Sequence, residues 1–209
     1  MADITTEQIK ELRDKTGVSI MQCKKALEET GGNIEEALLV LRKISGEMAA
    51  KKADRVAVDG AIAVASANGK AALVVLHSET DFVAQNADFV AAVEELAKEA
   101  LANGVEATRE AAKKRAEELV LKIGENIIPG EAVVIGGEHV GIYLHHNRKA
   151  GALVAINGGT DEFAKDLATH VAAMNPLYKS EAEIPADAKE KIIAFFEKET
   201  ASIVFTPLV

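Results

Sequence analysis

The first 45 residues carry apolar side chains at the three- and four-residue spacing of amphipathic helices, interrupted by glycines, which predicts three short helices. Ser19 and Gln22 have the spacing of a capping box, in which each side chain binds a free backbone N–H at a helix start. Asn33 begins the third helix in a similar way. We therefore expect a three-helix domain over residues 1–45, followed by a basic helical connector over residues 46–58.

Beyond the connector the pattern becomes strand-like. Asn68-Gly69 separates the apolar runs 61–65 and 71–76, and it predicts a β-hairpin because Asn-Gly accepts the positive φ of a tight turn. Two amphipathic helices are expected next, over about residues 87–102 and 108–123.

The remaining pattern again alternates between strands and helices. Pro129-Gly130 is expected to turn the chain. The further expected elements are strands over 132–135, 140–144 and 152–156, a helix from 160 to about 174, a loop between Pro176 and Pro185, a helix over about 187–199 and a strand over 202–205.

A shift of 80 residues superposes two parts of the chain without a gap. Ala72-Leu73-Val74 falls on Ala152-Leu153-Val154, and Thr80-Asp81 falls on Thr160-Asp161. Such self-similarity indicates one structural unit present twice. We therefore expect an α+β fold, in which the helical domain precedes a core of two related subdomains, 59–130 and 131–209, each an antiparallel hairpin or sheet packed with helices.

Phe82 is the residue that the repeat does not explain. After the shared Thr-Asp, the second copy has Glu162, and its Phe163 stands one place later. Most phenylalanines are buried, but Phe82 follows a polar run at a strand-to-helix junction, where an aromatic side chain is a typical anchor for a partner. Asp81 is expected to be the N-cap of the following helix.

The charge distribution disfavours nucleic acid as a direct ligand. Residues 1–55 are neutral overall, so the rest of the chain carries the whole net charge of −9, and clustered cations are lacking. Apolar runs are far shorter than the ~20 residues of a membrane helix. The single Cys23 and the absence of an apolar leader sequence favour a cytoplasmic location. A protein partner fits this composition best.

Catalytic and metal-binding motifs are missing from the sequence. His145 and His146 are expected to point to opposite faces of a strand, and Cys23 lies at a spacing that indicates a core residue. Gly136-Gly137 and Gly158-Gly159 are interpreted as hairpin turns, because neither belongs to a phosphate-binding motif. We expect no enzyme activity and no cofactor.

Several segments resemble bacterial elongation factor Ts, in the order of that family. They are Leu12–Gly17, Met21–Leu27, Ala49–Ala53, Glu79–Ala84, Lys122–Ile127 and His170–Ala173. The sequence departs from the family at Pro129-Gly130, where two arginines are common, and after residue 199, where a coiled-coil segment and a returning C-terminal segment are usual. The C-terminal part is therefore expected to be shortened.

The resemblance implies a guanine-nucleotide exchange factor for the GTPase elongation factor Tu, with a ubiquitin-associated-like N-terminal domain. It implies that Phe82, with Asp81, enters the partner and disturbs its magnesium and phosphate site, and that the adjoining Thr80 and Val83 also contact the partner. Partner contacts are also implied for the residues Leu12, Ile20, Met21, Lys24 and His170. The alternative is an adaptor that binds a protein without exchange activity, and self-association is left open.

Overall fold

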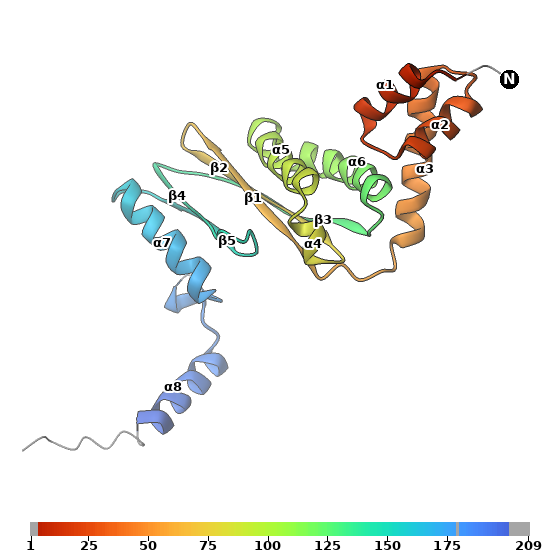
Figure 1. Cartoon of the computed structure of the whole chain (residues 1–209). Helices are drawn as coiled ribbons and strands as arrows, with labels where there is room; N and C mark the ends of the chain where they lie inside the picture. The colour runs from red at the N-terminus through yellow and green to blue at the C-terminus, as the bar shows by residue number, and fades with distance from the viewer. Residues whose placement is uncertain (1–3, 179, 201–209) are drawn as a thin grey trace, which may run out of the picture. The chain divides into compact units, whose positions relative to one another are not determined.

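The computed structural model describes residues 4–178 and 180–200 (Figure 1). Three helices come first, followed by strands and helices in an α+β arrangement. The elements are α1 Thr6–Thr16, α2 Ile20–Glu29, α3 Ile34–Lys52, β1 Asp59–Ala67, β2 Lys70–Ser78, α4 Asp81–Ala84, α5 Ala87–Asn103, α6 Val105–Ile123, β3 Ile127–Gly136, β4 His139–Leu144, β5 Gly151–Ile156, α7 Asp161–Met174, the 3₁₀ helix η1 Glu181–Glu183 and α8 Ala186–Thr200.

The predicted helix starts of the N-terminal module are confirmed. Thr5 and Ser19 each form a capping box with the glutamine three residues later, and the Asn33 side chain accepts hydrogen bonds from two free N–H groups of α3. Gly17 ends α1 with a φ of 68°, a conformation that a side chain would strain. Local cap chemistry therefore defines this module.

The third helix does not end where the module was expected to end. α3 continues without a break past the expected boundary at residue 45 to Lys52, and the helical part of the connector belongs to the same helix. Met48, in this extension, packs against both the core of the three-helix module and the core of the first sheet. One uninterrupted helix thus contributes side chains to two hydrophobic cores.

The first sheet has three antiparallel strands in the order β1-β2-β3. The hairpin turn is confirmed, because Asn68 and Gly69 both have positive φ, at 53° and 70°. β3 pairs with β2 and continues across the expected boundary at residue 130 to Gly136. Pro129 and Gly130 lie inside β3 rather than in a turn, at an irregularity in the register. Proline lacks an N–H to donate, and it is tolerated here on an edge strand beside a bulge.

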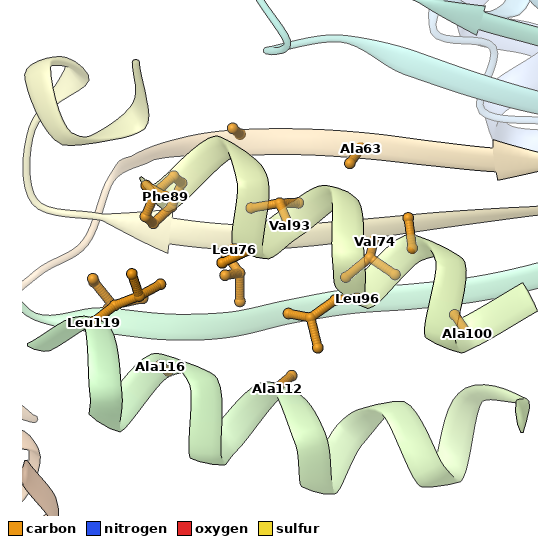
Figure 2. Close-up of a cluster of buried hydrophobic side chains, with 14 of the residues drawn as sticks. Ala63, Val74, Leu76, Phe89, Val93, Leu96, Ala100, Ala112, Ala116 and Leu119 are labelled. Carbon is orange, nitrogen blue, oxygen red and sulfur yellow. The ribbon is translucent and has the colours of Figure 1, made fainter. Parts of the chain in front are cut away.

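Helices α5 and α6 pack with this sheet and form its core. Figure 2 shows Phe89, Val93 and Leu96 of α5 directed toward the strands, and Ala116 and Leu119 of α6 in the same cluster. Phe89, Val93 and Leu96 are buried, as their helical spacing predicts. The two helices α5 and α6 thus complete the hydrophobic core of the first copy.

The second copy contains the β4–β5 hairpin and α7. Leu73 pairs with Val64 and Leu153 pairs with Ile142, so β5 lies 80 residues after β2 but β4 lies only 78 residues after β1. The second hairpin therefore has two more residues between these paired positions than the first. Gly141 lies directly under α7, because a Cβ atom placed there would be 1.8 Å from the carbonyl oxygen of Ala164.

Two glycine pairs have a role other than the expected hairpin turns. Gly136-Gly137 leads from the first sheet to β4 of the second, and Gly158-Gly159 leads from β5 to α7. Both Gly158 and Gly159 have positive φ, which explains glycine at that connection.

The chain divides into two compact units, residues 1–172 and 173–209. The second unit contains η1 and the predicted helix α8, whereas the strand expected over 202–205 lies outside the described residues. Within the described ranges, 4–178 and 180–200, no helix is long and apolar enough to cross a membrane.

Candidate partner-binding site

The turn that carries Phe82 begins where β2 ends at Ser78. Thr80 is the N-cap of α4, and its Oγ1 accepts a hydrogen bond from the Val83 N–H at 3.4 Å. The second copy uses the same cap, since Thr160 Oγ1 accepts from the Phe163 N–H at 3.1 Å. The expectation that Asp81 is the cap is therefore corrected: threonine caps both helices, and Asp81 is the first residue of α4.

α4 has only four residues, and they divide into an outer and an inner pair. Phe82 is 83% exposed, and Asp81 is exposed beside it. Val83 is only 8% exposed and, like Ala84, is buried, so both anchor the helix. The resemblance implied a partner contact for Val83, and the structure places this side chain in the core, where it supports the site from inside.

A segment 45 residues further along the chain holds this turn. The Glu125 carboxylate accepts two hydrogen bonds from Thr80, from the backbone N–H at 3.1 Å and from Oγ1 at 2.7 Å. The backbone N–H of Asn126 donates to Glu79 Oε1 at 2.6 Å. We call Glu125 and Asn126 the clamp of the Phe82 turn.

The connector after α3 completes this network. Asn126 Nδ2 donates to the Arg55 carbonyl at 2.7 Å, and Arg55 forms an ion pair with Glu79 at 3.5 Å. Lys52 Nζ donates to the Gly124 carbonyl at 2.6 Å. The N–H of Asn126, followed by the charge of Arg55, lowers the pKa of Glu79, although partial desolvation acts in the opposite direction. Glu79 is therefore held as a carboxylate at neutral pH.

Sequence reasoning missed the clamp. The signal was present, because Lys122–Ile127 is one of the segments that resemble the family, but no spacing rule connects Glu125 with Thr80. The contacts are formed only when the end of α6 lies beside the end of β2.

Helix α2 provides a second exposed surface. Met21 is 75% exposed and Ile20 is also exposed, while Lys24 lies on the same helix in an ion pair with Glu28 at 3.7 Å. Leu12, for which the resemblance implied a partner contact, is fully buried in the core of the module. Cys23 is buried as predicted, and desolvation raises the pKa of its thiol.

Among the described residues, the histidines belong to no cluster that could hold a metal ion. His170 is exposed on α7. His145 and His146 follow β4 instead of lying within it, and their ring centroids are 4.2 Å apart, so the argument from opposite strand faces does not apply. Over the described residues, no group of three or more His, Cys, Asp or Glu side chains could hold a metal ion.

The chain is similar to curated proteins along most of its length. Residues 79–203 match the family model described as elongation factor TS. Elongation factor Ts of Hahella chejuensis is 43% identical over 201 residues, which cover 92% of this chain and 70% of that protein. The Pseudomonas putida protein is 46% identical over 197 residues, covering 91% and 67%, and that of Psychrobacter sp. is 41% identical over 206 residues, covering 93% and 70%.

The matched residues contain the structural features of the site described above. They include the Phe82 turn and the clamp, and the pairwise similarity extends through nearly the whole chain, although the relatives are longer. The chain belongs to the elongation factor Ts family, whose members are nucleotide exchange factors and not enzymes.

Proposed function

We propose that this chain accelerates GDP release from elongation factor Tu and that Phe82 is the group that acts on the GTPase. The observation that carries the proposal is an aromatic ring 83% exposed to solvent, on a helix whose next two residues are buried. Burying such a side chain contributes roughly 1.5–3 kcal/mol. A ring that is held outside its own core can supply this energy to a partner.

Linkage converts that binding energy into nucleotide release. If the chain binds nucleotide-free elongation factor Tu more tightly than the GDP form, it must weaken GDP binding by the same factor. Each ~1.4 kcal/mol of this coupling corresponds to about tenfold. Protein interiors are densely packed, so an inserted ring forces a discrete displacement. In the proposal, this displacement disturbs the magnesium and phosphate site of the partner, and Asp81 enters beside the ring.

The exposed side chains of α2 provide the second contact. Ile20, Met21 and Lys24 present two apolar side chains and one cation on a single helix. Their role is to hold the partner while Phe82 acts, so they contribute to affinity more than to the maximum rate. His170, exposed on α7, is proposed as a further contact.

Stopped-flow release of fluorescent GDP from elongation factor Tu tests the proposal. Wild-type chain should accelerate release, and Phe82→Ala should lower the maximum accelerated rate at least about tenfold, the value of ~1.4 kcal/mol. The matched control is Phe163→Ala, because Phe163 is the aromatic of the second copy and is 54% exposed. Phe163→Ala should leave the maximum rate within about twofold of wild type, which corresponds to a change of less than about 0.5 kcal/mol in activation free energy.

Two results would oppose this assignment. A normal rate for Phe82→Ala would remove the ring from the mechanism. Tight binding of elongation factor Tu by the wild-type chain, with no faster GDP release, would instead identify the chain as an adaptor.

A further inference from the structure

We propose that Glu125 and Asn126 are positioning residues for nucleotide exchange, which fix the direction in which α4 presents Phe82. This inference rests on the proposed function of Phe82. It assigns a role to side chains that do not contact the partner themselves but that determine where the ring lies before the partner arrives.

The contacts of the clamp are concentrated on the two residues that precede α4. One carboxylate, that of Glu125, accepts from both donors of Thr80. The backbone of Asn126 binds the Glu79 side chain, and its own amide, which is 3% exposed, donates to the Arg55 carbonyl. Because hydrogen bonds to charged groups are the stronger ones, the backbone at Glu79 and Thr80 is held in one conformation.

A four-residue helix needs such support. Isolated helices shorter than about 12 residues are marginal in water, because nucleation fixes several residues for one hydrogen bond. α4 is anchored by the burial of Val83 and Ala84 on one side and by the Thr80 cap at its start. Loss of the clamp would let the cap move, and the Phe82 ring would then have to be ordered during docking, at a cost in free energy.

Comparison of the two copies of the repeat distinguishes this positioning role from a general structural role. Thr160 caps α7 as Thr80 caps α4, at 3.1 Å and 3.4 Å respectively. Among the described residues, however, no carboxylate accepts a hydrogen bond from Thr160, whereas Glu125 accepts from Thr80. In the second copy the helix therefore starts with the threonine cap and without a counterpart of Glu125 in the described part of the chain. The clamp is found in the first copy, in which the aromatic Phe82 directly follows Thr80-Asp81.

The clamp is itself fixed to the three-helix module. Leu121, at the end of α6, is buried in the core of that module, and Lys52 at the end of α3 donates to the Gly124 carbonyl at 2.6 Å. The segment from Leu121 to Asn126 therefore touches both the module and the Phe82 turn. Because the three-helix module holds this segment, Glu125 and Asn126 stay in place when the Phe82 turn moves.

The experiment measures GDP release by full-length chains that carry Glu125→Ala or Glu125→Gln, each with Phe82 intact or as Phe82→Ala. Glu125→Ala should lower the maximum rate about ten- to a hundredfold, the size expected when an acting group is misplaced, with a smaller change in the half-saturating concentration. Glu125→Gln retains one acceptor oxygen and should restore part of the rate. In the Phe82→Ala background, Glu125→Ala should have no further effect, because residues that act through one group are not additive.

Two controls distinguish positioning from loss of stability. Thr80→Val removes the hydroxyl that binds Glu125, and Thr160→Val makes the same change in the second copy, where only the cap is lost. Thr160→Val should lower the melting temperature, and Thr80→Val should lower it at least as much because it also loses the bond to Glu125, but only Thr80→Val should slow exchange. Amide hydrogen exchange at Val83 and Ala84 of the free chain should become faster in Glu125→Ala, while core amides of α5 remain protected.

The possible outcomes are separable. If Phe82→Ala slows release but Glu125→Ala does not, the positioning role is overturned and the role of Phe82 stands. If Glu125→Ala slows release equally with and without Phe82, the clamp acts on stability or on another contact and the inference is also wrong. If the wild-type chain itself gives no acceleration, the proposed function and this inference fall together.

Discussion

Replacing Gly141 by alanine should destabilise the second copy of the repeat. The added Cβ would lie 1.8 Å from the Ala164 carbonyl oxygen and 2.2 Å from the carbonyl carbon, whereas real Cβ atoms essentially never approach closer than 3.0 Å. Both neighbours are backbone atoms at the start of α7, so no flexible side chain can move aside. The helix would have to move away from the strand by roughly 1 Å, and overpacking of this kind typically costs about 1–3 kcal/mol.

The repeat provides a reference for this change. Ala63 in β1 pairs with Val74 as Gly141 in β4 pairs with Val154. Ala63 is fully buried, so the first copy accommodates a methyl group at the related place. The expected loss is therefore specific to the close approach of α7 and not to alanine in a strand.

Chemical denaturation followed by circular dichroism measures the loss, and Gly46→Ala is the matched control. A Cβ at Gly46 would meet nothing closer than Glu117 Oε2 at 3.8 Å. Because alanine is favoured over glycine inside a helix by about 0.8–1.0 kcal/mol, Gly46→Ala in α3 should stabilise the module. The same chemical change should thus have opposite signs at the two positions. An unchanged or raised midpoint for Gly141→Ala would refute the reasoning.

The other predictions concern buried and charged groups in the same chain. Leu12→Ala should lower the free energy of unfolding by about 2–5 kcal/mol, because it opens a cavity in the module, whereas Met21→Ala should change stability by no more than about 0.5 kcal/mol and weaken binding of elongation factor Tu. Urea midpoints and a titration of binding separate these effects. The pKa of Glu79 is lowered in the folded chain by the Asn126 N–H and by Arg55, so its stabilising contribution is present at neutral pH and is lost as the pH falls through the glutamate range. Glu79→Gln should therefore lower stability at pH 7 and make it less sensitive to acid between pH 6 and about 3, a range that spans the ordinary glutamate pKa. An equal acid dependence in both chains would count against this account.

Features that depend on neighbouring residues could be predicted from the sequence. Ser19 with Gln22 and Asn68 with Gly69 determine a helix start and a tight turn through contacts within a few residues. The exposure of Phe82 was also inferred, from its place after a polar run and from the repeat. These inferences succeeded because the relevant chemistry is local.

Features that depend on distant pairing could not be predicted in this way. β3 pairs with β2 across an interval that contains three helices, so its membership of the first sheet was missed and Pro129-Gly130 was interpreted as a turn. The bond between Glu125 and Thr80 has the same origin, because it depends on how α6 ends against the sheet. The burial of Leu12 has a similar origin, since a motif shared with a family does not tell whether a side chain is on the surface or in the core.

The difference of two residues between the hairpins has a consequence for how this repeat can diverge. Directly opposed residues of an antiparallel pair lie on the same face of the sheet, so extra residues in the loop leave both strands facing as before while the pairing is kept. A slip of the pairing by one residue would instead turn the apolar side chains of one strand to the other face. Gly141 and Ala63 accordingly both face their helices although the loops differ in length. Loop length is therefore free to vary between the copies, and the pairing register of the strands is what has to be preserved.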